Sequence, residues 1–593
     1  MRAYKPPCVL QARDLIHRLC VRGTMTIPFG QALRLPRPWM AFGMLRRLGR
    51  VLAAVGVLAI LSGPAALGEP PLAISVPAVS PLEDVLHRGE ALETERRWAD
   101  AVAHYEEALR QFPHDAALRQ RFAHARRHYE VTRRYHDRSF RALLGRLSPA
   151  EATALYAEVL LKIQAHYVET PQWSDLVEAG NQGLAAALEE LDFLQAHGLW
   201  GRPLPAAGFL EDARARLANH RPATRAEACQ WVATTAALAQ QRLGISPTAV
   251  ILEYTSAAAS SLDPYSAYLT PDQLSDVYAQ IRGNFVGLGI ELKPQANTLV
   301  IVRVIANSPA KAAGLREGDR IVGVDGQPAT GLPPDRVAAM LQGPEGSVVT
   351  LSVSGPNGQV RNVVARRQRV EVPSVDEAHI LPGTDGVAYV KITGFQETTA
   401  RDLDRTLWDL YRRGMKSLIV DLRGNPGGLL RSAVETADLF LQRGVIVTTR
   451  GRSVQEDFTY SAHEPGTWGV PLAVLIDQES ASAAEIFAGA IREHQRGTVI
   501  GKRSYGKGSV QGIFALNVGQ AGLRLTTARF YSPSGRPYSA GVEPQIVVHQ
   551  TARPLADALD RPLRSEALAD PRPIDDPFLL AALETLRQPV AQR

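Results

Sequence analysis

The feature that most constrains the fold is a repeated order of strand, small-residue turn and helix in the second half of the chain. Ser417–Leu422 is an apolar run typical of a buried strand; it ends in the glycine-rich turn Asp421–Gly428, and Leu429–Leu441 has helical spacing. Leu472–Ile476 is another apolar strand, followed by a cluster of small residues and a helix over Ala483–Arg492. This order predicts an α/β core with reactive groups along one rim of its sheet.

Ser482 is the candidate nucleophile because the small residues of Ser480–Ala484 leave its hydroxyl reachable. Lys507 stands between two glycines twenty-five residues later, and Gln511 follows four residues after it. Burial lowers the pKa of a lysine, and a neutral amine can take the proton of a serine as that serine attacks a carbonyl. The pattern therefore predicts a serine nucleophile with a lysine base, and Ser480 remains the alternative nucleophile.

Two glycines of the Asp421–Gly428 turn, Gly427 and Gly428, let backbone N–H groups point at a developing oxyanion. The N–H of Ala483, at the start of the predicted helix, is the expected second donor. The alternative is that the glycines only shape the bend from strand to helix. His494 is an alternative catalytic residue, although the serine and lysine chemistry requires no histidine.

A nucleotide site is the competing interpretation of the lysine turn. Gly501–Gly508 almost matches the phosphate-binding pattern G-x-x-x-x-G-K-[ST], but Gly508 replaces the hydroxyl residue that would bind Mg²⁺. The following run, Ser509–Phe514, has the character of a strand rather than of the helix such a loop must precede. The sequence therefore argues against nucleotide binding.

Residues 284–368 change to the alternation expected of strands and contain GLGI, SPAKAAGLREGD, IVGVDG and LQGPEGSVVTLSV. Together these motifs resemble a PDZ domain of the bacterial protease type. Backbone N–H groups of such a loop can hold a terminal carboxylate while an edge strand pairs with the peptide. The expected groove is lined by Gly287, Leu288, Gly289, Ile290, Val337 and Leu341. The alternative is a degenerate domain that only packs against its neighbour.

The segments SLDPYSAYL, DLRGNPGGLL, SASAAEIFAGA, YGKGSVQ and LTTARFYSPSGRP resemble the carboxyl-terminal processing peptidases, also called tail-specific serine proteases. The resemblance covers about Leu155–Val547. It implies a crotonase-like β-α superhelix as the protease core. It also implies the roles of the site residues: Ser482 as nucleophile, Lys507 as general base, Gln511 as the residue that orients the lysine, and Gly427 or Gly428 with Ala483 as the oxyanion hole. Gly424 departs from the asparagine of many relatives.

Pro81–His114 fits one tetratricopeptide unit. The small and aromatic packing residues of that repeat match Gly89, Ala101, Tyr105, Ala108 and Pro113. Only one copy is visible, and Asp115–Tyr135 is expected to form a capping helix. The functional interpretation is a module that binds an adaptor protein or self-associates; the structural one is a plain helical hairpin.

Ser148–Leu194 is predicted to be helical and begins with the capping box Ser148–Glu151. Gln195–Arg225 is polar and contains Ala and Pro, which predicts an insertion or a long connection. Helix resumes by Val250–Ala259, and Ser260–Pro271 is expected to be a turn-rich linker with a few buried tyrosines.

The start of the chain has the order of a secretory signal. Met44–Arg50 is basic, Val51–Leu61 is an uninterrupted run of eleven apolar residues, and Ser62–Gly68 supplies small residues for cleavage. The alternatives are an uncleaved membrane anchor and a cytoplasmic protein. Residues 1–39 fit no part of a signal, so we expect translation to begin at Met40 or Met44.

Charge and cysteine content exclude several function classes. The net charge of +6 comes from the start of the chain: residues 1–68 contain ten Lys and Arg and one acid, so residues 69–593 hold 56 basic and 59 acidic residues. We therefore expect no nucleic-acid partner. Of the three cysteines only Cys229 follows the signal, which predicts one thiol and no disulfide. No zinc-binding pattern is present, and no metal or cofactor is expected.

These observations predict a multidomain α/β protein with an α-helical front. The expected parts are a signal or anchor (1–68), a tetratricopeptide-like region (81–140), a helical protease region (141–283), a PDZ domain (284–370), a serine protease core (371–550) and a tail (551–593). The expected function is an extracytoplasmic, periplasmic endopeptidase that acts on proteins with accessible C-termini and touches the membrane only through an uncleaved anchor. The alternative is a non-catalytic scaffold that binds through its PDZ and tetratricopeptide-like parts.

Overall fold

The computed structural model describes residues 27–31, 81–203, 205–295, 298–332, 334–355, 357–463, 467–549 and 576–587. They form two compact units. One unit contains strand β1 (Ile27–Gln31), residues 131–285 and the described residues from 371 onward; the other contains residues 81–130 and 286–370. The basic and apolar runs of the predicted signal lie outside the described residues, and none of the described helices is long and apolar enough to cross a membrane.

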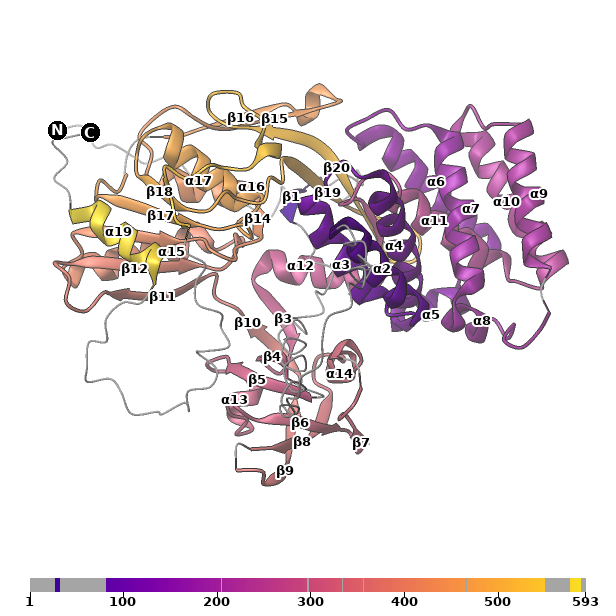
Figure 1. Cartoon of the computed structure of the whole chain (residues 1–593), viewed down its shortest axis with the longest axis horizontal. Helices are drawn as coiled ribbons and strands as arrows, with labels where there is room; N and C mark the ends of the chain where they lie inside the picture. The colour runs from indigo at the N-terminus through magenta and orange to yellow at the C-terminus, as the bar shows by residue number, and fades with distance from the viewer. Residues whose placement is uncertain are drawn as a thin grey trace, which may run out of the picture. The chain divides into compact units, whose positions relative to one another are not determined.

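Three helices form the front of the chain (Figure 1): α2 (Pro81–Thr94), α3 (Trp98–Gln111) and α4 (Ala116–His136). Gly89 on α2 is small for a packing reason, because a Cβ there would lie 2.2 Å from the ring of Tyr105. The Tyr105 hydroxyl donates to Glu93 at 2.8 Å, and Ala101 and Ala108 are buried beside it. The expected hairpin and third helix are therefore present, while the tetratricopeptide assignment stays a prediction.

The helical part of the protease unit is larger than the sequence suggested. Its helices are α5 (Arg138–Arg146), α6 (Pro149–His166), α7 (Trp173–Glu189), α8 (Leu191–Ala196), α9 (Ala206–Asn219), α10 (Arg225–Leu243), α11 (Pro247–Ser260) and α12 (Pro271–Arg282). Ser148 and Glu151 form the predicted capping box at the start of α6. The prediction of a connection over Gln195–Arg225 was wrong for its second half: Phe209, Ala213 and Leu217 recur every four residues and are buried, which makes α9 part of the helical core.

The PDZ region is a six-stranded antiparallel sheet with two short helices. Its strands are β4 (Ile290–Gln295), β5 (Thr298–Val304), β6 (Arg320–Val324), β7 (Gln327–Pro328), β8 (Val348–Ser354) and β9 (Val360–Arg366), and its helices are α13 (Pro309–Ala312) and α14 (Pro334–Leu341). Strands β3 (Asn284–Gly287) and β10 (Gln368–Glu371) pair where the chain enters and leaves it. Within the described residues β4 is an edge strand, paired only with β5.

The protease core is built on a sheet with the order β11-β12-β13-β17-β18-β21. The strands are β11 (Val375–Ile380), β12 (Val387–Ile392), β13 (Ser417–Asp421), β17 (Leu472–Ile476), β18 (Thr498–Gly501) and β21 (Ile546–Val547), and all pairs except β11 with β12 are parallel. Every residue of β13 and β17 is buried, because helices cover both faces. The faces are covered by α15 (Thr399–Arg412), α16 (Leu430–Asp438) and α17 (Ala483–Glu493) on one side and by α19 (Pro577–Arg587) on the other.

A second sheet completes the core, with the order β14-β1-β19-β20-β15-β16 and β2 paired to β20 (Figure 1). Its other strands are β2 (Ala267–Leu269), β14 (Gly427–Leu429), β15 (Val445–Gly451), β16 (Phe458–Ser461), β19 (Ser509–Ala515) and β20 (Gly522–Tyr531). Strand β1 pairs antiparallel with β14 and β19, with Gly30 opposite Gly428 and Phe29 opposite Gln511. The glycine-rich turn leads into β14 and the turn around Lys507 leads into β19. Strand β1 therefore occupies the position between these two strands in the sheet.

Candidate active site

Ser482 ends the turn that joins β17 to α17. Its φ of +56° lies in the left-handed region that a non-glycine residue rarely adopts. The side chain is 1% exposed, and its backbone N–H donates to Glu485 at 2.6 Å. Strained backbone at the end of a buried strand is frequent at functional sites, and here the fold holds it firmly.

The alternative nucleophile, Ser480, has a structural role in the same turn. Its hydroxyl donates to the carbonyl of Leu422 at 2.9 Å and accepts from the N–H of Asp477 at 3.0 Å. The Asp477 carboxylate in turn accepts the N–H of Gly424. Ser480 therefore ties the serine turn to the glycine turn, which leaves Ser482 as the better nucleophile candidate.

Glu485 is the site residue that sequence reasoning missed. Its carboxylate is 1% exposed and accepts four hydrogen bonds, from Ser482 N (2.6 Å), Ser504 Oγ (2.6 Å), Gly506 N (2.7 Å) and Lys507 N (2.9 Å). Burial raises the pKa of Glu485, and these hydrogen bonds oppose that effect. One side chain thus links the serine turn to the lysine turn.

Lys507 is completely buried. Its Nζ has no hydrogen-bond partner among the described residues and lies 4.8 Å from the centre of the Tyr265 ring. Burial lowers the pKa of Lys507 well below its usual value, and the positive charge of Arg524 lowers it further. A neutral, unpaired amine in a closed site is the form that a general base requires.

The segment around Tyr265 is more than the linker that the sequence suggested. Asp263 accepts the N–H groups of Tyr265 (2.7 Å) and Ser266 (2.9 Å), and the Tyr265 carbonyl accepts from Arg524 Nε at 2.7 Å. These bonds fix the ring that covers Lys507. The prediction of a turn-rich linker over Ser260–Pro271 was wrong for Ala267–Leu269, which form strand β2 paired with β20, and it missed the contact of Tyr265 with Lys507.

Gln511 is buried on β19, the strand that follows the lysine turn. Its Nε2 donates to Ser509 Oγ at 3.0 Å, and its Oε1 has no partner among the described residues. A buried acceptor and a buried donor, Gln511 Oε1 and Lys507 Nζ, are thus both unsatisfied in this part of the core. Such orphaned groups are costly, and they are expected where a reacting group has to be bound.

The two glycines predicted for the oxyanion hole have different roles. The N–H of Gly427 donates to Asn425 Oδ1 at 2.8 Å and is therefore occupied. Gly427 has a φ of +101°, and a Cβ there would lie 2.8 Å from Ser482 Cβ and 2.9 Å from Ala483 N. Glycine is thus required for close approach to the serine. Gly428 and Ala483, the first residue of α17, are the remaining donor candidates.

The competing residues and motifs do not fit catalysis. His494 caps the far end of the eleven-residue helix α17, roughly 16 Å along the axis from its first residue, and its Nε2 lies 2.7 Å from the carbonyl of Val445. The turn around Lys507 continues into strand β19 rather than a helix, which contradicts a phosphate-binding loop. No cluster of His, Cys, Asp and Glu suited to a metal occurs in the described part of the chain.

The predicted PDZ groove residues divide into buried and partly exposed ones. Leu288, Val337 and Leu341 belong to the core of the domain, with 3%, 2% and 8% of their surface exposed, and Ile290 packs against that core from the first residue of β4. Gly289 has a φ of +80°, and a Cβ there would lie 2.2 Å from Ser308 Cβ. The GLGI loop therefore leads directly into the unpaired edge of β4.

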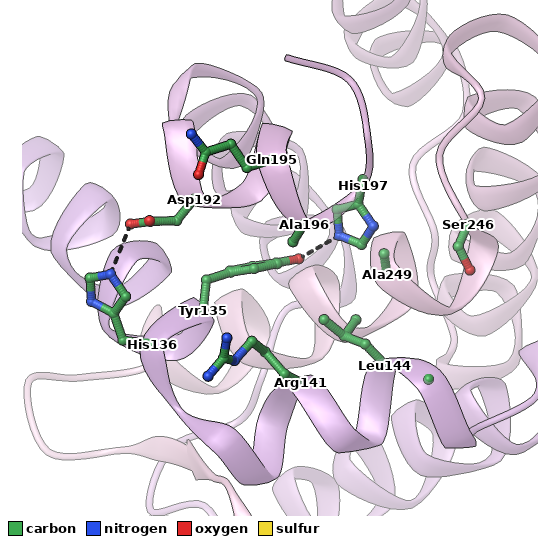
Figure 2. Close-up of a pocket in the computed structure, with 11 residues that line it drawn as sticks. Tyr135, His136, Arg141, Leu144, Asp192, Gln195, Ala196, His197, Ser246 and Ala249 are labelled. Atoms are coloured by element: carbon green, nitrogen blue, oxygen red, sulfur yellow. Dashed lines mark hydrogen bonds and ion pairs between the residues drawn. The ribbon is translucent and has the colours of Figure 1, made fainter. Parts of the chain in front are cut away.

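A separate cavity of about 590 Å³ lies among the helices of the protease unit (Figure 2). Tyr135 and His197 meet in it at 3.0 Å, and His136 lies 3.4 Å from Asp192. Burial lowers the pKa of His197 to about 4, so this ring is neutral at neutral pH. None of the candidate catalytic residues lines this cavity.

Comparison with protein families gives two matches. Residues 386–548 match peptidase family S41, and residues 300–354 match the PDZ domain. The first match includes Ser482, Lys507 and Gln511, and the second includes strands β6 and β8.

Similar curated proteins include the carboxy-terminal-processing protease of Bartonella bacilliformis, 38% identical over 298 residues that cover 49% of this chain and 67% of that protein. The carboxyl-terminal-processing protease of Synechocystis sp. is 34% identical over 297 residues, which cover 49% of this chain and 68% of the relative. The solved photosystem II D1 C-terminal processing protease is 24% identical, with a TM-score of 0.37. The match covers 67% of this chain and 93% of the chain in that structure. A solved PDZ domain of the carboxy-terminal protease from Vibrio cholerae, in complex with peptide, is 30% identical with a TM-score of 0.14; it covers 15% of this chain and 99% of its own.

Proposed function

Because the chain belongs to the carboxy-terminal-processing proteases of peptidase family S41, and is thus a serine peptidase, we propose that Ser482 and Lys507 form its catalytic dyad. One observation supports this most directly: the backbone N–H groups of both residues donate to a single oxygen, Glu485 Oε2, at 2.6 and 2.9 Å. The peptidase assignment also removes the scaffold alternative.

In the proposed reaction neutral Lys507 takes the proton of the Ser482 hydroxyl while the serine oxygen bonds to the substrate carbonyl carbon. The N–H groups of Gly428 and Ala483 stabilise the oxyanion, and one such donor contributes about 2.7–4 kcal/mol to the transition state. Protonated Lys507 then gives its proton to the leaving amine as the C–N bond breaks. Lys507 next deprotonates the water that releases the acyl group from Ser482. In this proposal Gln511 orients the lysine by accepting from its Nζ through Oε1, since both atoms are buried without a partner among the described residues.

The substrate is proposed to bind as an extended strand between β14 and β19. Strand β1 pairs with both of them in antiparallel register, beside Gly428 and Gln511, which supports the capacity of these edges for a peptide. A chain cleaved after the signal at Gly68 lacks β1. The position between β14 and β19 is then available to a substrate peptide. The crotonase-like superhelix remains our proposal for this core; consecutive parallel strands with helices between them support it.

The PDZ domain of the protease is proposed to select substrates by their C-terminal tails. The N–H groups of Gly287, Leu288 and Gly289 would hold the terminal carboxylate, and the edge of β4 would pair with the tail from Ile290 onward. The match of residues 300–354 to the PDZ domain family supports peptide binding by this region. The helical hairpin α2–α3 is a further binding surface in this proposal, for an adaptor protein or a second copy.

Amidation of the tail tests this recognition. A fluorescent peptide that ends in valine should bind the full-length Ser482→Ala chain at least about tenfold more tightly with a free carboxylate than with a C-terminal amide, since hydrogen bonds to a charged group contribute about 1.5–3 kcal/mol. Fluorescence anisotropy measures both affinities, and a peptide with a scrambled internal sequence is the control for nonspecific binding. Equal affinity of the acid and the amide would refute tail recognition.

The protein is also proposed to act outside the cytoplasm, as the basic and apolar runs at Met44–Leu61 indicate. Mass spectrometry of the precursor and of the exported chain should show a start at Met40 or Met44 and a mature N-terminus near Ala66 or Gly68. Peptides from residues 1–39 in the precursor would disprove the start site. An exported chain that keeps Val51–Leu61 would indicate an anchor, and a chain confined to the cytoplasm would refute export.

A further inference from the structure

The last described helix, α19, packs on the face of the main sheet opposite α15, α16 and α17. Its Phe578, Ala582 and Leu583 are buried against alternate residues of β12, β13, β17 and β18. The helix lies in the segment that was predicted as a tail (551–593). Its position at the carboxyl ends of β13 and β17 suggests a function.

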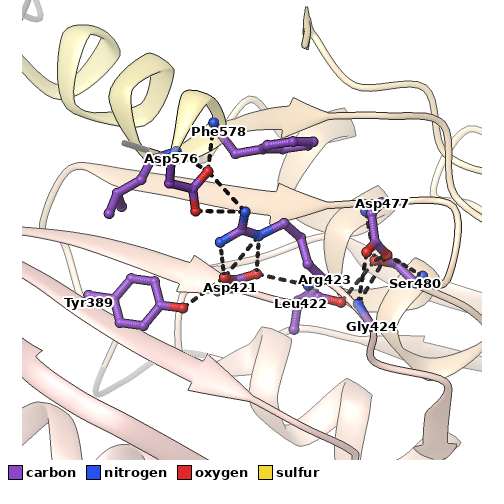
Figure 3. A network of polar contacts seen from close by, with 10 residues as sticks. Tyr389, Asp421, Leu422, Arg423, Gly424, Asp477, Ser480, Asp576 and Phe578 are labelled. Atoms are coloured by element: carbon purple, nitrogen blue, oxygen red, sulfur yellow. Dashed lines mark hydrogen bonds and ion pairs between the residues drawn. The ribbon is translucent and has the colours of Figure 1, made fainter. Parts of the chain in front are cut away.

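Arg423 connects this helix to the glycine-rich turn Asp421–Gly428 (Figure 3). Its guanidinium lies 2.6 Å from Asp421 on one side and 2.8 Å from Asp576 on the other, with its centre 5.1 Å from that of the Phe578 ring. Asp421 is 1% exposed and also accepts from the Tyr389 hydroxyl at 2.8 Å. The cation is thus held between the end of β13 and the start of α19.

Asp576 has two roles in this contact. Besides pairing with Arg423, it accepts the N–H of Phe578 at 2.9 Å as the N-terminal cap of α19. Asparagine caps helices about as well as aspartate but has no charge for the arginine. The ion pair can therefore be weakened while the helix keeps its cap.

The residues after Arg423 are anchored one by one. The Gly424 N–H donates to Asp477 at 3.0 Å, the Asn425 side chain donates to Ile392 O at 2.7 Å, and the Gly427 N–H donates to Asn425 at 2.8 Å. Gly424 has a φ of +72° and Gly427 a φ of +101°. Glycine residues restrict the backbone little, so this segment could adopt other conformations if its contacts were lost. Its conformation depends on contacts at both ends, and Arg423 is the contact at the entry.

We propose that Arg423 and Asp576 are positioning residues: through them α19 fixes the start of the Arg423–Gly428 turn and so aligns the Gly428 N–H with the oxyanion. This rests on the proposed function for the role of Gly428. A misplacement of about 1 Å in a catalytic group can cost about a hundredfold in rate, so a loosened turn lowers kcat. Substrate capture by the PDZ domain does not involve this contact and stays unchanged.

Asp576→Asn in the full-length chain tests the proposal. The expected kcat for a tailed protein substrate is about 10- to 100-fold lower than wild type, with KM and tail-peptide affinity unchanged. Hydrogen exchange of the amides in residues 424–428 should be faster. The thermal midpoint should shift by no more than about 4 °C, because the pair is partly exposed. The matched control is Glu584→Gln, which removes a charge from the exposed side of the same helix.

Two outcomes would overturn the proposal: wild-type exchange rates in residues 424–428, or a kcat equal to that of Glu584→Gln. Failure of the proposed function gives a different result, in which hydrolysis is absent from the wild-type chain or survives Ser482→Ala. In that case the exchange rates still decide whether α19 holds the turn. Deletion of α19 is a poorer test because it exposes the apolar face beneath the helix.

Discussion

Ser482→Ala and Lys507→Ala are each expected to lower peptide-bond hydrolysis by at least about a thousandfold while tail-peptide binding persists. The serine variant has no nucleophile, and the lysine variant has no group that can take the serine proton. Each substitution removes side-chain atoms from a closed core without charging it, so the fold should survive. Cleavage of a tailed substrate followed by gel and mass spectrometry measures the loss, and anisotropy with the tail peptide measures binding.

The pH dependence of hydrolysis identifies the base as a lysine. Only neutral Lys507 can accept a proton, so kcat/KM should rise as pH rises through the pKa of Lys507, which burial and Arg524 place well below 10.5. Lys507→Arg should be inactive at every pH, because a guanidinium stays charged. Lys416→Ala is the matched control, since that side chain is 65% exposed and pairs only at the surface with Asp385. Full activity of Ser482→Ala or Lys507→Ala would falsify the dyad.

The parts that sequence reasoning predicted well are those where a local pattern determines the structure. The strand Leu472–Ile476 has the predicted bounds, and the strand predicted over Ser417–Leu422 and the helix predicted over Ala483–Arg492 each differ from the observed element by one residue, because apolar periodicity and turn residues mark their ends. Helix α9 was missed because its alanine-rich, polar composition obscured the four-residue spacing of Phe209, Ala213 and Leu217.

The details of the candidate site depend on contacts between distant segments, and these were not predictable from local patterns. The N–H of Gly427 is occupied by Asn425, which a glycine pattern cannot reveal. Tyr265 reaches Lys507 from more than two hundred residues away in the sequence. Glu485 did leave a local signal, since Ser482 and Glu485 have the S-x-x-E spacing of a capping box. Its hydrogen bonds to Gly506 and Lys507 join segments that are distant in the sequence, so the spacing alone could not predict them.

Glu485→Ala is expected to destabilise the protease unit by at least about 3–5 kcal/mol and to abolish hydrolysis even though Ser482 and Lys507 remain. The substitution removes the common acceptor of three backbone N–H groups and the Ser504 hydroxyl, and each buried donor left without a partner costs about 1–3 kcal/mol. Thermal unfolding measures the stability. Hydrolysis is measured at a temperature where circular dichroism shows the variant folded.

Two further variants separate the arrangement of the turns from general stability. Glu485→Gln keeps the shape but replaces one acceptor oxygen with an amide that opposes the donors, so its stability and activity should lie between wild type and Glu485→Ala. Glu435→Ala removes an exposed carboxylate whose pair with Arg431 contributes about 0.3–0.5 kcal/mol, and it should leave both quantities near wild type. A folded Glu485→Ala chain with wild-type kcat would mean that the serine and lysine turns hold their positions without this carboxylate. The serine and the lysine come from separate turns of the chain, and the backbone hydrogen bond from Tyr505 N to Ser480 O at 2.9 Å also joins these turns, so that bond would then be the source of their alignment.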